Sequence, residues 1–415
     1  MKIAFLTDTF SRRTGSIQRV LPKYLARCGA EVYVITMDLS PYHEDGAFRG
    51  FVEPLVKGET DHMDGFKLYV VGHESLLGYP RMAGLRKILA LHRPDVVQCQ
   101  QAIGWIPLDA ARLKSSFGYK LFTGNHNAMS TSRSVLGIGG SALQRGKSFL
   151  TRYLAGRIAS YATERCYAVT SDCAEIAWRY YGVQKHKVEI MHLGVDTDFF
   201  YPVAKTQTPA ERSAMRKELD FGAEDIVCVY SGKMTEEKNP RILALAVNRL
   251  RAMGFAYSGL FIGDGVQRKA IQSMGFCRVV DFMHFSKLGA CFRATDIGVW
   301  PTNESSSMLD AAACGIPIII SDGVVYREHV DGNGLVYRMN DLDDLVAKLL
   351  ALKSPQQRAQ LGRVGAEKMK RDFSWESVAR RRIAHYCEAL QLADLTNSSS
   401  GSAAIANSAP RDSCF

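Results

Sequence analysis

The stretch DIGVWPTNESSSMLDAAACGIPIIIS, residues 296–321, carries the clearest indication of the fold. Its pattern is typical of a buried strand, a polar turn from Thr302 to Ser307, a helix of small residues, and a second buried strand entered through Gly315 and Pro317. A strand, a helix and a strand in this order predict a βαβ unit and a parallel sheet. The N-terminus of the helix then lies at the carboxyl edge of the sheet, where such proteins bind ligands.

The same alternation continues in both directions from this unit. Strand-like runs occur in the second half as IVCVYSG, GLFIGDG and CRVVDF, and in the first half as KIAFLT, EVYVIT, DVVQCQ and KLFTGN. Between the two series, DFFYPVAKTQTPAERS has two prolines and no sustained periodicity, which is typical of a hinge. We therefore predict an α/β protein with domains at 1–202 and 203–375, a helix at 376–393, and a disordered Ser- and Ala-rich tail at 394–415.

Composition limits the class of protein. The chain has 415 residues, 47% hydrophobic and 23% charged, which suits two globular domains and excludes a fibrous or disordered protein. No apolar run reaches the roughly 18 residues that span a bilayer, and Asp8 interrupts the N-terminal run, which we interpret as a strand and not as a secretion signal. Ten cysteines without CxxC spacing favour a reducing, cytoplasmic location and no zinc site.

Charge alone leaves the partner open. The net charge of +10 favours an anionic partner, and nucleic acid, acidic lipid and sugar-nucleotide phosphates all satisfy it. No recognised nucleic-acid-binding module or basic-aromatic array is present, so we expect no nucleic-acid partner.

Two features at the predicted carboxyl edge of the second sheet suit a diphosphate. Lys233 and Lys238 lie five residues apart on the loop that leaves IVCVYSG. Two ammonium groups there can neutralise a diphosphate, whereas the simpler alternative is two solvated lysines before a helix. Backbone N–H groups and serine hydroxyls at the start of the helix that follows Glu304 can bind phosphate oxygens. The alternative for this turn is that Glu304 and Ser305 only cap the helix.

Two carboxylates and two glycines complete the candidate donor site. Glu304, in the turn, is placed to approach a sugar ring, and Asp310, about one helical turn later, to accept hydrogen bonds from ribose hydroxyls. Gly263 and Gly265 flank Asp264 after another strand, so the backbone there can turn tightly and approach a ligand.

These motifs, in this order, resemble those of the retaining glycosyltransferases of family 4, which have the GT-B fold. DAAACGIP, starting at Asp310, resembles the family's Glu-Ala-Met-Ala-Cys-Gly-x-Pro element, HLGVDTDFF resembles its hinge segment, and IGDG its Gly-Asp-Gly turn. Lys233 and Lys238 match the spacing of the family's basic pair. Asp310 replaces the second glutamate, and Glu304 lies six residues before it instead of eight, so the sugar-side loop is shorter.

The first domain contributes two further matches. DTFSRRTGSIQRV resembles the family's glycine loop and makes Gly15 a contact for donor and acceptor, with Thr14 where the family has a second glycine. FTGNHNAMS places His126 where the family has a histidine that reaches the donor sugar. The resemblance covers about residues 1–390.

The resemblance implies two Rossmann-like domains across a cleft, with the last helix returning to the first domain. It implies transfer of a sugar from a UDP- or GDP-type donor to an acceptor hydroxyl with retention, in glycolipid, lipopolysaccharide or exopolysaccharide synthesis, without a metal or other cofactor. The residues it assigns to catalysis are His126, Lys233, Lys238 and Glu304. Those it assigns to the donor are Gly15, Gly263, Gly265, Ser306, Ser307, Met308 and Asp310.

Two alternatives to a transferase stay open on the sequence alone. A GT-B sugar-nucleotide epimerase and a non-catalytic sugar-nucleotide-binding protein would share these motifs. Two Asp-x-Asp strings, at 196–198 and 341–343, resemble metal-binding pairs, but we interpret them as part of the hinge and as a helix start.

The segment at 145–165 predicts a basic amphipathic helix that rests on an anionic membrane surface. The protein would then be peripheral on the inner face of the membrane, with a glycan or lipid-linked acceptor. A core helix with a solvated basic face is the alternative.

Overall fold

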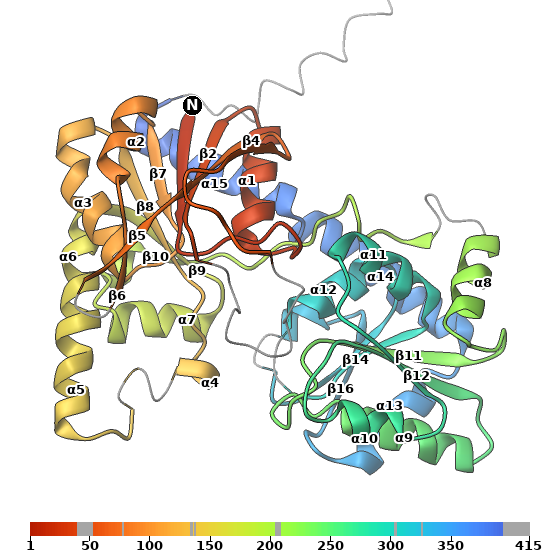
Figure 1. Ribbon diagram of the computed structural model, residues 1–415. Helices are drawn as coiled ribbons and strands as arrows, with labels where there is room; N and C mark the ends of the chain where they lie inside the picture. Colours follow the sequence, from red (N-terminus) through yellow and green to blue (C-terminus); the bar gives the residue numbers. More distant parts are fainter. Residues whose placement is uncertain are drawn as a thin grey trace, which may run out of the picture.

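The computed structural model describes residues 1–39, 53–76, 79–132, 136, 138–203, 209–302, 305–324 and 327–392. Its strands form two large sheets in two separate lobes, each covered by helices on both faces (Figure 1). Pairing within the sheets is parallel except at one edge, where β3 runs antiparallel to β4. The predicted α/β class with two parallel sheets is therefore confirmed.

The N-terminal sheet has eight strands in the order β10-β9-β8-β7-β1-β2-β4-β3, and a separate hairpin is formed by β5 and β6. The strands are β1 (Lys2–Thr7), β2 (Glu31–Met37), β3 (Thr60–Met63), β4 (Phe66–Val71), β5 (His73–Leu76), β6 (Tyr79–Met82), β7 (Val96–Cys99), β8 (Lys120–Asn125), β9 (Thr163–Ala168) and β10 (Val188–Ile190).

The helices of this lobe include two segments of π-helix, η2 and η3, and one 3-10 turn, η4. Their bounds are α1 (Ile17–Arg27), α2 (Leu85–His92), α3 (Trp105–Phe117), α4 (Met129–Ser132), α5 (Ala142–Ser148), η2 (Phe149–Leu154), α6 (Ala155–Ala162), α7 (Ser171–Glu175), η3 (Ile176–Tyr180) and η4 (Lys185–Lys187).

The C-terminal sheet has six strands in the order β13-β12-β11-β14-β15-β16. They are β11 (Ile226–Ser231), β12 (Tyr257–Ile262), β13 (Cys277–Val280), β14 (Ile297–Trp300), β15 (Ile318–Ser321) and β16 (Gly334–Tyr337). The helices of this lobe are α8 (Pro209–Glu218), α9 (Arg241–Ala252), α10 (Arg268–Gln272), α11 (Phe285–Ala294), α12 (Ser306–Ala313), η6 (Arg327–His329), α13 (Leu342–Ala351) and α14 (Pro355–Asp372), and α15 (Trp375–Leu390) follows them.

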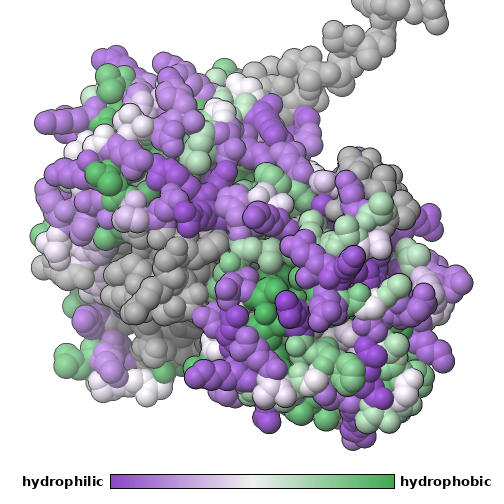
Figure 2. All heavy atoms as spheres, turned by 45° about the vertical axis from the view of Figure 1, so that its right-hand side comes forward, coloured by the Kyte–Doolittle hydropathy of each residue, from purple (hydrophilic) through white to green (hydrophobic). Residues whose placement is uncertain are grey.

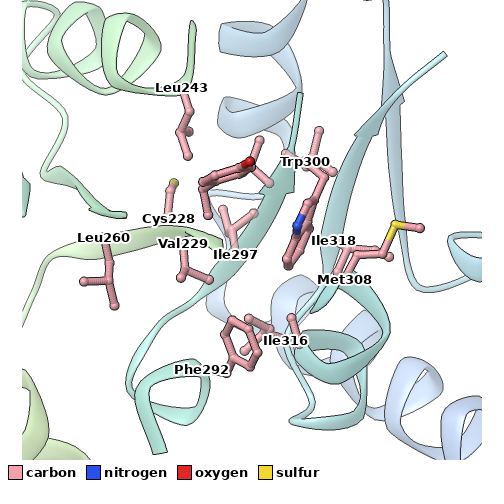
Figure 3. Packing of buried hydrophobic residues seen from close by; sticks show 14 of the residues in the cluster. Cys228, Val229, Leu243, Leu260, Phe292, Ile297, Trp300, Met308, Ile316 and Ile318 are labelled. Carbon is pink, nitrogen blue, oxygen red and sulfur yellow. The ribbon is translucent and has the colours of Figure 1, made fainter. Parts of the chain in front are cut away.

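The core of the C-terminal lobe explains why its strands are almost wholly apolar. Side chains of β11, β12, β14 and β15 meet those of α9, α11 and α12, and Figure 3 shows Val229, Ile297 and Trp300 packed among them. Both faces of such a sheet are covered, so its strands lack the alternation of half-buried strands.

The chain crosses between the lobes twice, and the two crossings are paired. The backbone N–H of Val195 donates to Phe373 O at 2.7 Å, and that of Trp375 donates to Val195 O at 3.0 Å. A Cβ on Gly194 would lie 2.7 Å from the backbone nitrogen of Trp375, so only glycine lets the two segments approach this closely.

The last helix lies against the N-terminal lobe. In Figure 1, α15 runs beside α1, and its buried Tyr386 and Arg382 both donate to Gln98 Oε1 in β7, at 3.0 and 3.1 Å. The tail predicted to be disordered, residues 394–415, lies outside the described residues.

One sequence prediction needs correction. The segment 145–165 is not one helix: α5, η2 and α6 follow one another, the helical part ends at Ala162, and 163–165 belong to β9. Arg165 pairs with Glu189 at 2.9 Å and Glu388 at 2.6 Å, so it does not share the helical cationic face. In the part of the chain that is described, no helix combines the length and the apolar character needed to cross a bilayer.

Buried charges fix the first crossing to α1. Asp196 is 4% exposed and accepts hydrogen bonds from Lys23 Nζ at 2.7 Å and from the Tyr24 hydroxyl at 2.8 Å. Lys23 also lies 2.7 Å from Asp198, which pairs with the half-exposed Arg27.

Replacing Lys23 with Met should therefore lower the free energy of unfolding by about 3–5 kcal/mol, because a buried carboxylate loses its countercharge. Urea unfolding followed by circular dichroism measures this loss. Arg27→Met is the matched control, and it should cost no more than about 1 kcal/mol, since its ion pair is solvated. Equal losses in the two variants would contradict this role of Lys23.

Candidate active site

The two predicted lysines lie in one cavity with the start of α12. A cavity of about 280 Å³ at the carboxyl edge of the C-terminal sheet is lined by Lys233 and Lys238 from the loop after β11, and by Ser305 and Ser306 from the turn before α12 and its first residue. Since β11 and β14 are neighbours, their following loops meet at this edge. Positive side chains and a helix N-terminus thus face one space, as a diphosphate requires.

Hydrogen bonds hold the two loops together. Ser231 O accepts from the Ser307 hydroxyl at 2.9 Å and from Trp300 Nε1 at 3.3 Å. The Thr302 hydroxyl donates to Glu237 O at 2.7 Å, next to Lys238 in sequence. These bonds connect the end of β11 to the end of β14 and the first turn of α12.

The two predicted glycines, Gly263 and Gly265, lie against the backbone of the loop that carries Lys233. Gly263 has a φ of +142°, and a Cβ there would lie 2.0 Å from Gly232 O; at Gly265 a Cβ would lie 2.7 Å from Met234 O. Both glycines therefore allow the loop after β12 to touch the loop that carries Lys233. Neither glycine lines the lysine cavity or the cavity between the lobes.

The first turn of α12 offers backbone and hydroxyl groups. The Ser305 side chain makes no capping hydrogen bond to α12 and instead lies 2.9 Å from the Ser307 hydroxyl, so the simple capping alternative is wrong for this residue. Met308 is 1% exposed and packs in the core, and its N–H donates to Ser305 O at 3.2 Å. Ligand contacts in this turn thus fall to Ser306 and its neighbours.

A second cavity, of about 290 Å³, lies between the lobes and adjoins the first. Gly15 and Asp310 line it, and Ser306 and Phe282 line both cavities. A Cβ on Gly15 would lie 3.5 Å from the Phe285 ring, so the β1–α1 loop touches the C-terminal lobe. Figure 2 shows a mostly hydrophilic face, with recessed hydrophobic atoms near the junction of the two lobes.

The environment of Asp310 destabilises the ionised form of its carboxyl group. Burial raises the pKa of its carboxyl well above the usual range, and the negative charge of Asp196 raises that pKa further. A buried carboxylate of this kind gains from hydroxyl donors. It is therefore suited to hold the hydroxyls of a ribose.

His126 follows β8 at the carboxyl edge of the N-terminal sheet. Its two ring nitrogens are shielded from solvent and have no hydrogen-bond partner among the described residues. Burial, with a smaller contribution from Arg382, lowers the pKa of His126 to about 4, so its ring is neutral near pH 7. It does not line either cavity described above.

Glu304 lies outside the described residues. Thr302 and Ser305, which come before and after it in the sequence, both line the lysine cavity. Two further residues of the lysine cavity, Phe282 and Tyr230, are not among those predicted from the sequence. Phe282 is the last residue of the predicted strand CRVVDF, so its position at a strand end was the available indication. Tyr230 lies one residue before the end of β11, and its hydroxyl donates to Lys233 O at 2.7 Å.

The two Asp-x-Asp strings have other partners. Asp196 and Asp198 bind Lys23, and Asp341 caps α13 by accepting from the Asp344 N–H at 2.9 Å. Within the described ranges, no three His, Cys, Asp or Glu side chains gather in a way that could hold a metal ion.

Comparison with known families gives a match in each half of the chain. The family model described as Glycosyltransferase Family 4 matches residues 20–199, and the model described as Glycosyl transferases group 1 matches residues 225–354. The first match covers most of the N-terminal lobe and the second most of the C-terminal lobe.

Curated relatives are similar at moderate identity. The D-inositol 3-phosphate glycosyltransferase of Geodermatophilus obscurus is 27% identical over 249 residues, which are 55% of this chain and 53% of that protein. This match thus spans about half of the relative's length. The protein of the same name from Mycobacteroides abscessus is 25% identical over 389 residues, 88% of this chain and 82% of that protein.

Solved structures share the fold. Sucrose-phosphate synthase from Thermosynechococcus elongatus is 16% identical with a TM-score of 0.67, over 94% of this chain and 99% of that one. HepE of Anabaena, solved in complex with UDP, is also 16% identical with a TM-score of 0.67, over 94% and 100%. The predicted GT-B arrangement is confirmed, and the chain belongs to glycosyltransferase family 4.

Proposed function

We propose that this protein is a retaining glycosyltransferase that moves a sugar from a nucleoside diphosphate to an acceptor hydroxyl. The observation that carries the proposal is that Lys233 and Lys238 line one cavity with the N-terminal turn of α12. A leaving diphosphate gains negative charge as the glycosidic bond breaks, and cations already in place at that point lower the barrier.

The roles of the other residues follow from their positions. Asp310, in the adjoining cavity, accepts hydrogen bonds from the ribose, and Ser306 binds phosphate where the two cavities meet. Glu304 orients the sugar, and neutral His126 reaches the donor sugar from the N-terminal lobe. The donor phosphate receives the acceptor proton on the same face of the sugar, and the step needs no metal.

The nature of the donor is supported by analogy. HepE of Anabaena was solved with UDP and with UDP-glucose, and the curated relatives are named D-inositol 3-phosphate glycosyltransferases. We propose a UDP- or GDP-sugar donor and a glycan or lipid-linked acceptor, in the synthesis of a glycolipid, lipopolysaccharide or exopolysaccharide. The reaction then takes place on the cytoplasmic side of the membrane.

A nucleoside-diphosphate release assay with a panel of donors and acceptors tests this function. Lys233→Ala and Lys238→Ala should each lower kcat by about 10²-fold or more, because the diphosphate loses a preorganised cation. Arg at either position should keep most of the activity, since it keeps the charge. Lys269→Ala, an exposed lysine on α10, is the matched control and should behave as the unchanged protein.

The same assay separates the rival functions. A sugar-nucleotide epimerase would release nucleoside diphosphate or change the sugar without consuming an acceptor, and a non-catalytic binding protein would bind donor without any release. Either result with the folded protein would contradict the transferase proposal.

Asp310→Asn should separate binding from stability. Donor affinity should fall about threefold to tenfold, because Asn has one acceptor oxygen where the carboxyl has two and a hydrogen bond from the ribose is lost. The variant should unfold at a higher temperature at pH 7. Since the pKa of Asp310 is raised in the folded state, the unchanged protein loses stability as pH rises above the usual carboxyl range, whereas Asn does not.

Thermal melts from pH 4 to pH 8, with calorimetric titration of UDP and GDP, measure both effects. The gain in melting temperature should be small at pH 4 and grow with pH. Asp281→Asn, an exposed carboxylate on the same lobe, should change neither quantity. A variant that binds nucleotide normally would contradict the role of Asp310.

We also propose that α5, η2 and α6 rest on an anionic membrane. Leu143, Phe149 and Tyr161 are 84%, 52% and 68% exposed, and Lys147 and Arg157 lie among them in sequence. Such a surface binds acidic lipid through both apolar and charged groups.

Binding to anionic liposomes should therefore weaken as salt rises, and Phe149→Ser should reduce it severalfold in a sedimentation assay. Val266→Ser removes an exposed apolar side chain from the C-terminal lobe and serves as the control. Absence of salt-sensitive binding by the unchanged protein would overturn this placement.

A further inference from the structure

A large apolar groove in the N-terminal lobe is not used by the donor site. It has a volume of about 570 Å³ and lies between α3, η2 and α6. Its walls are chiefly hydrophobic and include Ile103, Trp105, Leu108, Leu150, Leu154 and Ile158. Pockets of this size and lining bind the apolar parts of small molecules.

The inner end of the groove is polar and lies at the cleft edge of the sheet. Asp8 follows β1, Gln101 follows β7 and Asn127 follows β8, and these three strands are neighbours. Asp8 also begins the loop that contains Gly15, and Gly15 lines the cavity between the lobes. The groove therefore opens toward the side of the N-terminal lobe that faces the donor.

Two of these polar groups are suited to a ligand. Gln101 Oε1 is shielded from solvent and has no hydrogen-bond partner among the described residues. Burial raises the pKa of the Asp8 carboxyl to about 6, so this group too gains from a hydrogen-bond donor. Shielded acceptors cost free energy unless a donor reaches them, and hydroxyl groups of a bound molecule can supply those donors.

The outer end of the groove continues into the exposed apolar surface of α5, η2 and α6. Leu150, Leu154 and Ile158 line the groove and are also 64%, 40% and 57% exposed. The wall between α5 and α6 is π-helical over Phe149–Leu154, a rare geometry that is frequent at functional sites.

The charges beside this opening favour one kind of occupant. Arg152 lines the groove, and Lys147 and Arg157 come from the same helical segment. Cations on the helical segment that forms one wall of an apolar opening complement a lipid that leaves a bilayer of anionic head groups. A water-soluble sugar acceptor has little apolar surface and would leave most of these hydrophobic walls uncovered.

We propose that this groove holds the apolar chain of an amphiphilic acceptor whose polar head lies against Asp8 and Gln101. The proposal rests on the transferase function and narrows its acceptor to a molecule with a long hydrocarbon chain. The chain would extend from the cleft edge of the sheet, past Trp105, to the exposed surface of α6.

The test measures binding of monomeric alkyl glucosides, from methyl to octyl, below their micelle concentrations by isothermal titration calorimetry. Each methylene that enters the groove should raise affinity by roughly fourfold until the groove is filled. Affinity that does not depend on chain length would overturn the proposal.

Two variants locate the effect. Ala155→Phe fills the groove from α6 and should abolish the dependence of affinity on chain length. Ile158→Gln lies at the exposed rim, so it should reduce the number of methylenes that add affinity without disturbing the core. Leu91→Gln, on α2 of the same lobe, is the matched control, because Leu91 is 74% exposed and does not line the groove. An unchanged dependence in both groove variants, with circular dichroism that shows normal folding, would contradict the assignment.

Two further results distinguish the groove proposal from the proposed function and from a dimer interface at the same surface. If nucleoside-diphosphate release fails with every donor while chain-length dependence remains, the proposed function is wrong and the groove is not. If Ile158→Gln instead converts a dimer to a monomer in size-exclusion chromatography, with no chain-length dependence in the unchanged protein, a second copy covers the groove and the proposal is wrong.

Discussion

A single backbone carbonyl joins the two parts of the proposed donor site. Ser231 O, at the end of β11, accepts hydrogen bonds from the Ser307 hydroxyl in α12 and from Trp300 Nε1 at the end of β14. The lysine loop begins directly after this carbonyl, and the first turn of α12 is bonded to it. Two sources of positive potential that are distant in sequence are therefore held around one cavity before any ligand arrives, which is what electrostatic catalysis requires.

The second constraint is that two carboxyl groups, those of Asp196 and Asp310, lie near each other where the lobes meet. Asp196 pairs with Lys23 and accepts a hydrogen bond from Tyr24, whereas the pKa of the Asp310 carboxyl is raised by burial and by the charge of Asp196. Asp196 thus stabilises the crossing between the lobes, and Asp310 holds unfavourable free energy that a ribose can relieve.

Much of the fold could be predicted because its strands are short, apolar and separated by helical patterns; the nine strand-like runs selected from the sequence include β1, β2, β7 and β8, and β11 to β15. Strands such as β3 (TDHM) and β10 (VEI) were missed because they lie at the sheet edges and carry polar residues. The proposed amphipathic helix ended early because its last residues pair in β9. The lysine pair and the start of α12 could be predicted from position along strands. The hydrogen bond between Lys23 and Asp196 joins residues 173 positions apart, and no local pattern indicates it.

The central claim is that Lys233, Lys238 and the first turn of α12 bind the diphosphate of the donor. A crystal structure with a nucleoside diphosphate bound tests it most directly. Our account predicts phosphate oxygens within about 3 Å of both lysine ammonium groups and of the Ser306 backbone N–H, with the ribose against Asp310. Phosphates bound elsewhere, with both lysines in solvent, would contradict the account.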